Sequence, residues 1–126
     1  MKIVALVARL LLGLVFFVFG LNGFLNFIHA PLPTGLAGQY LNALIQSHYI
    51  FVVAAVQVIG GALLLVNRYV PLALTILGPM LVNILSYHVF LNLTGLPLAL
   101  VVTLLWAILA WRHRQAFTGI FVQRSA

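Results

Sequence analysis

Six polar side chains interrupt the long apolar runs of this chain, and their types and spacing suit them to specific chemistry. They are Asn22, Asn26, Gln57, Asn83, Tyr87 and His88. Asn22 and Asn26 lie one helical turn apart, as do Asn83 and Tyr87, so each pair shares one face of a helix. Amide, phenol and imidazole groups make hydrogen bonds. The pattern therefore predicts a polar cluster between helices.

Two interpretations of this cluster differ in function. Polar side chains between apolar helices commonly hydrogen-bond to one another, which stabilises packing by about 0.6 kcal/mol per contact in a membrane. Alternatively, a mostly apolar pocket with a few placed polar groups binds a small molecule. The polar side chains would then be partners for the carbonyl oxygens of a quinone or a similar amphipathic ligand. The candidates for this role are Gln57, Asn83, Tyr87 and His88.

His88 also carries a metal-ligating group, because a neutral imidazole nitrogen is a common protein ligand of haem and related tetrapyrroles. A bis-histidine site needs a second histidine at a similar depth on another helix. His29 and His48 are the outer candidates, and both are predicted to lie at the surface. The sequence therefore favours a hydrogen-bonded histidine and no metal site, with a tetrapyrrole or a carotenoid as alternative ligands of the cluster.

The composition excludes several classes of chemistry. The chain has no cysteine, which removes disulfides, thiolate ligands and thiol redox chemistry. It has no aspartate or glutamate, which removes paired-carboxylate catalysis and carboxylate sites for hard cations. No glycine-rich phosphate loop is present, and the serines lack the partners of a catalytic triad.

The elements that must position the polar residues are predicted to be membrane-spanning helices. The chain is 65% hydrophobic, whereas ordinary soluble domains contain about 45–50% apolar residues. A soluble domain of 126 residues cannot bury that much apolar surface. The apolar runs cover residues 10–27, 49–66, 70–91 and 96–111, which predicts an all-α transmembrane four-helix bundle with a single domain over residues 1–126.

A shorter element is predicted between the first two spans. Thr34 is a candidate N-cap that follows two prolines. After it, apolar residues recur at helical spacing between glutamines and asparagine. These apolar residues are Leu36, Tyr40, Leu41, Leu44 and Ile45. The pattern predicts a short extracytoplasmic amphipathic helix that lies on the membrane surface or covers the end of the bundle.

Small residues predict where helices approach closely. Gly13 and Gly20 lie on the face of the first span opposite Asn22, so the two faces cannot both point at the bundle centre. If the asparagine face points inward, the glycine face is free to meet another helix, including one from another subunit. Gly60 and Gly61 in the second span are further packing candidates. Pro79 is expected to bend the third span, with neighbouring groups satisfying the freed carbonyl.

All lysines and arginines fall on one side of this four-span topology. They are Lys2, Arg9, Arg68, Arg112, Arg114 and Arg124. By the positive-inside rule, both termini and the loop between the second and third spans are predicted to be cytoplasmic. Arg9 is expected to extend its side chain to the headgroups. The predicted partners of these cations are membrane lipids and not nucleic acid.

The layout resembles the DoxX family of small bacterial membrane proteins over nearly the whole chain. The first span reads RLLLGLVFFVFGLNG from Arg9 to Gly23, Gly60 and Gly61 form a pair in the second span, and Pro71 opens the third. Family members often carry an acidic residue before that glycine pair, where this chain has Gln57. A proton-coupled role is therefore not expected.

The resemblance implies a compact four-helix protein of the bacterial inner membrane. Relatives have been linked to thiosulfate:quinone oxidoreductase and to complexes that handle oxidative or thiol stress, where the redox centre generally belongs to a partner. We therefore expect an auxiliary or anchoring subunit of a redox-related membrane complex, without intrinsic catalysis, that binds a membrane-protein partner or forms a homo-oligomer. The alternatives are a quinone-, carotenoid- or tetrapyrrole-binding protein and a small-molecule transporter with a path through Gln57 and Asn83.

Overall fold

The computed structural model of the protein describes residues 2–26, 31–121 and 123, and within these residues the fold is all-helical. The α-helices are α1 (Lys2–Leu25), α2 (Gly35–Gln46), α3 (Ile50–Leu65), α4 (Val70–Phe90) and α5 (Leu96–Arg112). Two short 3-10 helices are η1 (Leu93–Gly95) and η2 (Arg114–Phe121). Three residues used in the sequence predictions, Phe27, His29 and Arg124, lie outside the described residues.

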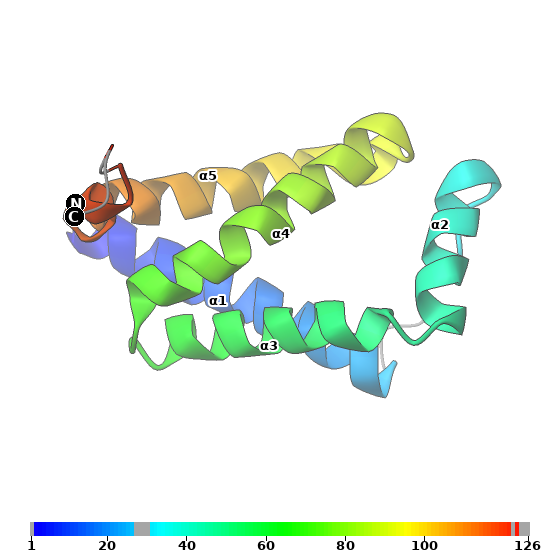
Figure 1. Ribbon diagram of the computed structural model, residues 1–126, viewed down its shortest axis with the longest axis horizontal. Coiled ribbons are helices and arrows are strands. Elements are labelled where there is room, and N and C mark those ends of the chain that lie inside the picture. Colours follow the sequence, from blue (N-terminus) through cyan, green and yellow to red (C-terminus); the bar gives the residue numbers. More distant parts are fainter. Residues whose placement is uncertain (1, 27–30, 122, 124–126) are drawn as a thin grey trace.

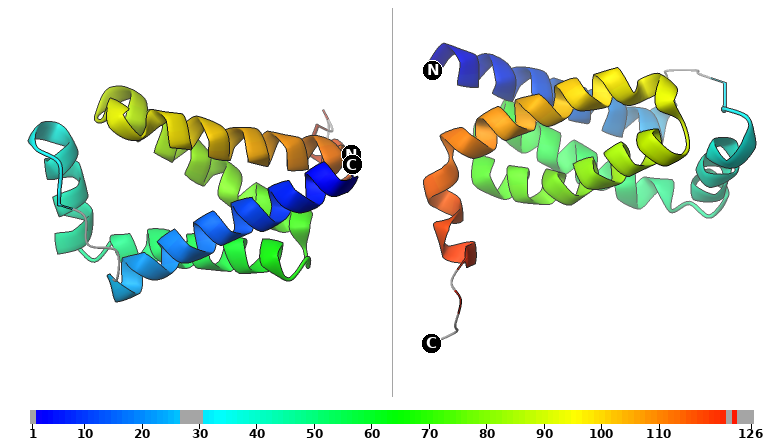
Figure 2. Two further views of the ribbon diagram at one scale, coloured as in Figure 1. Left: turned by 180° about the vertical axis from the view of Figure 1, so that it is seen from behind. Right: turned by 90° about the horizontal axis from the view of Figure 1, so that it is seen from above.

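Four long helices lie side by side, and α2 lies across one end of them (Figure 1). α1 packs against α3 and α5, and α4 packs against the same two helices, so the contacts form a ring. The start of α1, the turn between α3 and α4, and η2 all lie at the end opposite α2 (Figures 1 and 2). We call the end covered by α2 the α2 end. We call the opposite end the basic end, because Lys2, Arg68 and Arg114 lie there.

The predicted spans agree with the helices at most boundaries. The runs 70–91 and 96–111 correspond to α4 and α5 within one residue at each end, and 49–66 exceeds α3 by one residue at each end. The first run was wrong at its start, because α1 begins at Lys2 and not at residue 10. Residues 2–9 contain no proline or glycine, so nothing ends the helix where the charged residues begin.

Three segments are individually long and apolar enough to cross a membrane: α1, α4, and α5 together with η1. α3 has only 16 residues, about 24 Å at 1.5 Å per residue, which is shorter than the roughly 20 residues of a typical span. α2 and α3 pass the same length and composition test only as a pair, and they meet at an angle of 86°. The described helices therefore include three or four candidate spans.

The apolar core lies toward the basic end. Its largest fully buried side chains are Leu12, Leu64, Leu74, Leu77 and Leu109. On α4, no residue after Leu81 is buried, and on α1 none of the described residues after Gly20 is buried. The pair α1 and α3 diverges from the pair α4 and α5 toward α2 (Figure 1). The tight packing at one end therefore leaves room for cavities at the other.

The closest helix packing is between α1 and α3, along a line of small residues. A Cβ atom added at Gly61 would lie 2.5 Å from the backbone nitrogen of Phe17 and 2.8 Å from the carbonyl oxygen of Gly13. A Cβ atom added at Gly20 would lie 2.8 Å from the backbone nitrogen of Val58. The predicted close approach of Gly13 and Gly20 to another helix is therefore found within one chain, where their face contacts α3.

Pro79 lies inside α4 without ending it. Trp106 of α5 donates a hydrogen bond from Nε1 to the carbonyl oxygen of Leu74, over 2.9 Å. This acceptor is one residue before Thr75, whose carbonyl loses its usual partner because proline has no backbone N–H. A Cβ atom added at Gly78 would lie 3.3 Å from the indole ring of Trp106. The neighbouring helix thus supplies a donor beside the proline, and Gly78 leaves space for it.

Local sequence explains the turns between the helices. Asn67 and Tyr69 adopt left-handed backbone conformations, with φ of 56° and 52°, and this reverses the chain between α3 and α4. Asparagine is among the residues that tolerate this region best. At the other turn, the side chain of Asn92 accepts a hydrogen bond from the backbone N–H of Thr94 over 3.1 Å. α4 and α5, which follow these two turns, each have a proline in the first turn of the helix, where the missing N–H has no cost.

Candidate functional site

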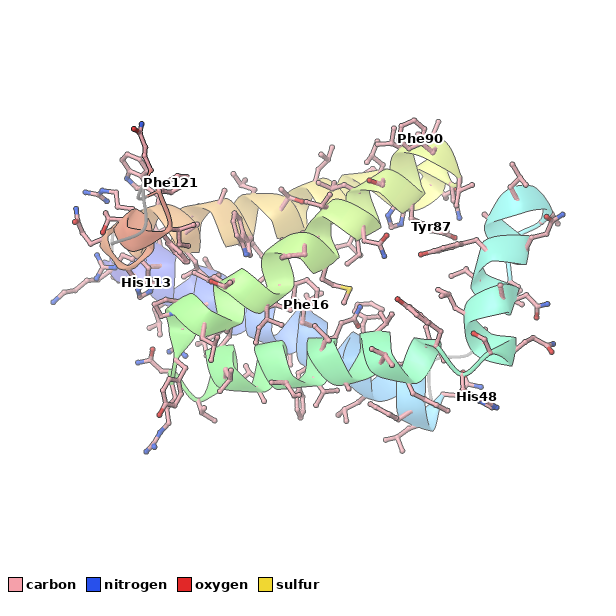
Figure 3. All side chains as sticks on the ribbon, viewed as in Figure 1. Phe16, His48, Tyr87, Phe90, His113 and Phe121 are labelled. Carbon is pink, nitrogen blue, oxygen red and sulfur yellow. The ribbon has the colours of Figure 1, made fainter. Side chains whose placement is uncertain are left out.

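A cavity of about 430 Å³ lies between the diverging helices near the α2 end. All five α-helices contribute to its wall, and most of the lining is apolar. The lining includes Val15, Phe16, Phe19, Leu41, Gln57, Ile84, His88, Gly95, Leu98, Ala99 and Val102. Figure 3 shows Phe16 pointing into the space between α1 and α4. Among the described residues, only Gln57 and His88 bring polar side chains to this wall, so these two determine which ligand chemistry it accepts.

Gln57 lies near the middle of α3 and is half-buried. Within the part of the chain that the structure describes, its side-chain amide has no hydrogen-bond partner. An amide in apolar surroundings without a partner costs about 1–3 kcal/mol. The cavity gives this amide access to a ligand or to water, either of which removes that cost.

His88 is held in one orientation by its own helix. Its Nδ1 atom lies 2.9 Å from the carbonyl oxygen of Ile84, one turn earlier in α4. A carbonyl oxygen only accepts hydrogen bonds, so Nδ1 carries the proton and donates it. In the neutral imidazole, Nε2 is then unprotonated and acts as the acceptor.

Gly95 packs directly against this nitrogen. A Cβ atom added at Gly95 would overlap His88, with Nε2 and Cδ2 as the nearest atoms. Gly95 follows the Asn92 cap and lies on the same cavity wall as His88. Its backbone dihedral φ is −91°, which any residue can adopt. The glycine is therefore required because the imidazole of His88 occupies the place of a side chain, and not because of its backbone conformation.

Asn22 and Asn26 belong to a neighbouring cavity of about 480 Å³. Phe19 and Leu41 line both cavities, so the two spaces share a wall. His48 lines this second cavity, where its ring stacks on Phe51 with the ring centroids 5.7 Å apart. His48 and His88 therefore do not face a common cavity, which gives no support to a bis-histidine tetrapyrrole site.

Tyr87 links α4 to α2 and does not line the main cavity. Its ring lies 5.6 Å from the ring of Tyr40, measured between centroids, and Figure 3 shows the side chain pointing from α4 toward α2. The ring of His88 meets Tyr87 edge-on at 5.0 Å. These contacts hold α2 across the end of the bundle and restrict the imidazole from its other side.

Asn83 lies apart from both cavities. It is exposed on α4 and lines a separate space of about 370 Å³ with Pro79, Met80 and residues of α3. Its amide has no hydrogen-bond partner among the described residues. Gln57 and Asn83 line different spaces, so the structure gives no support to a transport path through both.

The structure thus divides the six polar residues of the predicted cluster among different surroundings. Gln57 and His88 share one cavity, Asn22 and Asn26 share a second, Asn83 lines a third, and Tyr87 packs between helices. Helical spacing placed Asn22 and Asn26 together correctly, whereas Asn83 and Tyr87 have different surroundings. It did not establish which helix faces meet.

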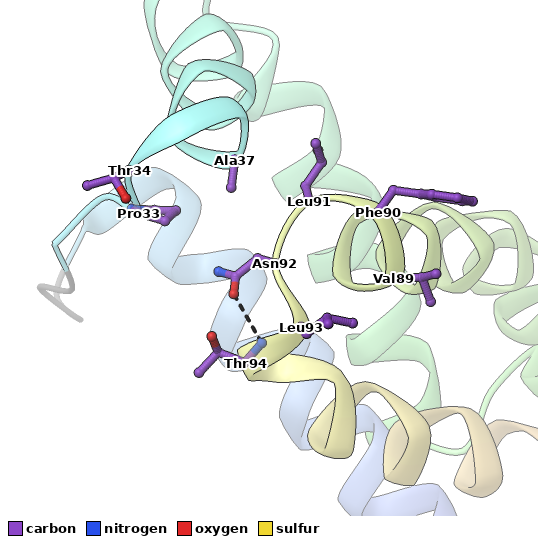
Figure 4. A pocket seen from close by; sticks show the side chains of 9 residues that line it. All are labelled: Pro33, Thr34, Ala37, Val89, Phe90, Leu91, Asn92, Leu93 and Thr94. Carbon is purple, nitrogen blue, oxygen red and sulfur yellow. Dashed lines mark hydrogen bonds between the residues drawn. The ribbon is translucent and has the colours of Figure 1, made fainter.

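Another hollow, of about 540 Å³, lies between the start of α2 and the turn that follows α4 (Figure 4). It is lined by Pro33, Thr34, Ala37 and residues 89–94. Thr34 occupies the N-cap position of α2, as predicted, although its side chain makes no capping hydrogen bond. The lining carries no titratable side chain, so this hollow is a weaker candidate for ligand chemistry.

The basic end has its own polar contacts. Arg9 donates to the carbonyl oxygens of Leu64 and Leu65, the second over 3.4 Å, in the last turn of α3. Arg114 lies over the ring of Trp111 at 4.5 Å from its centroid. Lys2, Arg68 and Arg112 are exposed. Burial, and secondarily the charge of the adjacent Arg112, lower the pKa of His113 below its ordinary value of 6.5, so this ring is largely neutral at pH 7.

Sequence reasoning did not predict the apolar lining of the main cavity, which includes Phe16, Phe19, Leu41 and Gly95. A signal for two of them was present. Phe16, Phe19, Asn22 and Asn26 follow one another at intervals of three and four residues, which places them along one face of α1. No comparable signal marked Gly95, which lies between the predicted runs 70–91 and 96–111.

The described residues hold no group of three or more side chains suited to bind a metal ion. Comparisons of the chain with protein-family models, with curated proteins and with solved structures find no match in any of the three. The resemblance to the DoxX family therefore stays a prediction from the residues quoted above. The arguments that follow rest on the geometry of this chain.

Proposed function

We propose that the protein is an integral membrane protein that binds a small amphipathic molecule in the cavity between Gln57 and His88. One observation carries this proposal. An amide without a partner in the described chain and the ring of a histidine line the same apolar cavity of about 430 Å³. A volume of this order with a few placed polar groups is typical of small-molecule sites.

The proposed setting is the bacterial inner membrane, with α1, α3, α4 and α5 as spans and the basic end in the cytoplasm. Support comes from Lys2, Arg9, Arg68, Arg112 and Arg114, which belong to the α1 start, the α3–α4 turn and the end of α5. In this orientation α2 covers the outer face. The short α3 then reaches the outer interface at the bend where α2 ends.

The proposed ligand is a ring compound of the quinone type. A compact cavity with one polar group on α3 and one on α4 suits a ring with polar substituents on two sides. The carotenoid and tetrapyrrole alternatives have less support, because an extended polyene has few groups for Gln57 or His88 to bind. His48, the other described histidine near this end, lines the neighbouring cavity.

The direct test is to purify the protein from its native membrane in mild detergent and to identify bound small molecules by mass spectrometry. We expect a stoichiometric ring compound in the wild type and its loss in Gln57→Leu. Leucine has a similar size and removes the unpaired amide, so we expect the ligand-free variant to be as thermally stable as the wild type or more stable. Asn83→Leu is the matched control, because Asn83 lines a different space.

Two outcomes would contradict the ligand-binding proposal. One is the absence of any stoichiometric small molecule from the wild-type protein. The other is an equal loss of ligand in Gln57→Leu and Asn83→Leu, which would place the ligand elsewhere or report a general loss of structure.

The second candidate function is that of an auxiliary or anchoring subunit in a redox-related membrane complex. The exposed position of Asn83 supports it. Its amide is exposed and without a described partner beside Pro79. A polar side chain on a lipid-facing surface is costly, and such residues commonly hydrogen-bond to another helix. On this proposal Asn83→Leu releases a co-purifying membrane protein or dissociates a homo-oligomer, whereas Gln57→Leu retains it. Co-purification followed by mass spectrometry measures both effects.

A further inference from the structure

A groove of about 400 Å³ lies toward the basic end, between α4, α5 and η2. Two polar side chains, Thr75 and Trp106, belong to its described wall. The hydroxyl group of Thr75 donates to the carbonyl oxygen of Pro71 over 2.9 Å. The indole of Trp106 donates to the carbonyl oxygen of Leu74. Because both side-chain donors are already used within the chain, the groove suits a hydrocarbon better than a polar molecule.

The apolar side of η2 closes this groove, and Figure 2 shows η2 turning from the end of α5 toward the side of α4. Phe117 packs against the core, whereas Ile120 and Phe121 keep 64% and 79% of their surface exposed. Contact with water costs about 25 cal/mol per Å² of such apolar surface. The rest of the wall belongs to α4 and α5, which are candidate membrane spans. A lipid acyl chain from the surrounding membrane therefore fits the groove.

Two exposed arginines flank the groove where α5 meets η2. Arg112 follows Ala110 of the wall by two residues, and Arg114 is the first residue of η2. The guanidinium of Arg114 lies over the ring of Trp111 and donates to the carbonyl oxygen of that residue over 2.9 Å. A guanidinium has five N–H donors, so most of them remain for a phosphate. The chain has no aspartate or glutamate, so none of its own side chains neutralises these two charges.

We infer that this groove binds an acyl chain of an anionic phospholipid, whose headgroup phosphate pairs with Arg112 and Arg114. The site lies away from the cavity lined by Gln57 and His88. The inference rests on the proposed membrane setting and not on the ligand of that cavity. Basic pockets between membrane-spanning helices on the cytoplasmic side are typical sites for anionic headgroups.

The test incubates the purified protein in mild detergent with equal amounts of phosphatidylglycerol and phosphatidylcholine that carry the same acyl chains. Native mass spectrometry counts the lipid molecules retained on each protein chain. Two arginines near the headgroup should favour the anionic lipid about tenfold or more. Arg112→Gln combined with Arg114→Gln should abolish this preference. Lys2→Gln combined with Arg68→Gln removes two charges from the same end and should keep it, because neither residue belongs to the elements around the groove.

A second pair of variants tests the acyl chain. Ala110→Phe places a large side chain in the groove and should lower the retention of both lipids several-fold. Ala107→Phe is the matched control, because Ala107 is exposed on the same helix and does not line the groove. An equal effect of the two substitutions would overturn the assignment of the acyl chain to this groove.

Equal retention of the two lipids by the wild-type protein, or retention of neither, overturns the inference without any variant. An equal loss of preference in the two double variants overturns it as well, because charge anywhere at the basic end would then suffice. Competition by glycerol phosphate, which has no acyl chain, would show a site for free phosphate compounds instead. Gln57→Leu should keep the lipid preference, so this test and the native-ligand measurement fail independently.

Discussion

At the scale of single residues, Arg9 shows how one side chain joins two helices. The sequence predicted that it extends to lipid headgroups, and the structure gives it protein partners at the same end of the molecule. The guanidinium donates to the carbonyl oxygens of Leu64 and Leu65. The last carbonyls of a helix have no partner within the helix and carry partial negative charge. Arg9 therefore satisfies the C-terminus of α3.

We predict that Arg9→Met lowers the free energy of unfolding by about 1–3 kcal/mol, because it leaves these carbonyls without their charged donor. Methionine retains most of the apolar length of the side chain, so packing changes little. Reversible unfolding of the purified protein in micelles measures the effect. Lys2→Met is the control, since Lys2 is exposed at the start of α1. An equal loss in both variants would show that positive charge alone, and not the contact with α3, is responsible.

At the scale of elements, the packing of α1 on α3 sets the geometry of the α2 end. The glycine line brings these two backbones close together. α4 and α5 form the other pair and diverge from them toward α2 (Figure 1). Gln57 and His88 therefore lie on opposite pairs, across a cavity that exists because the pairs separate.

We predict that Gly61→Ala destabilises the protein by about 1–3 kcal/mol, the usual cost of overpacking. The new methyl group would contact backbone atoms of Phe17 and Gly13, which cannot move without separating the helices. The thermal midpoint of the purified protein measures this effect. Gly119→Ala is the control, because a Cβ atom added there meets nothing within 4 Å. A stable Gly61→Ala protein with an altered oligomeric state would show instead that this face binds another subunit.

At the scale of the whole molecule, the two ends differ in chemistry. The basic end contains the described cations and most of the buried core, whereas the α2 end contains the cavity lined by Gln57 and His88 and the neighbouring cavity lined by Asn22 and Asn26. Three or four of the described helices are candidate spans. In the proposed orientation, a ligand reaches the cavity between Gln57 and His88 from the outer half of the bilayer.

The absence of cysteine makes this orientation directly testable. We predict that Gln39→Cys, on α2, reacts with a membrane-impermeant maleimide in intact spheroplasts. Gln115→Cys, in η2, should react only in inverted vesicles or after permeabilisation. Both glutamines are exposed, so the two sites are matched in accessibility. Reversed labelling would contradict the proposed orientation. Labelling of both sites from one side would require an even number of spans between them, whereas the proposal has three: α3, α4 and α5.

The sequence predicted most helix boundaries because these depend on local features. The length of the apolar runs predicted the extents of α4 and α5. In the structure, Asn67 lies in the turn before α4, and a proline lies in the first turn of both α4 and α5. The start of α1 was missed because the prediction counted membrane thickness, and a helix does not have to end where the apolar core of a membrane ends. The gathering of cations at one end followed from the alternation of helices along the chain.

The sequence by itself therefore determined the helices, their order along the chain and the end of the molecule at which the lysines and arginines lie. Tertiary structure decided which faces meet: that Gly13 contacts α3 of its own chain, that Gln57 shares a cavity with His88, and that Asn83 does not. The physical reason is that these helices are apolar on nearly every side. In a soluble protein an apolar stripe indicates the buried face, but a helix that is apolar all round carries no such direction. Its rotation is set by close packing and by a few hydrogen bonds between helices, which depend on the three-dimensional arrangement of all of them.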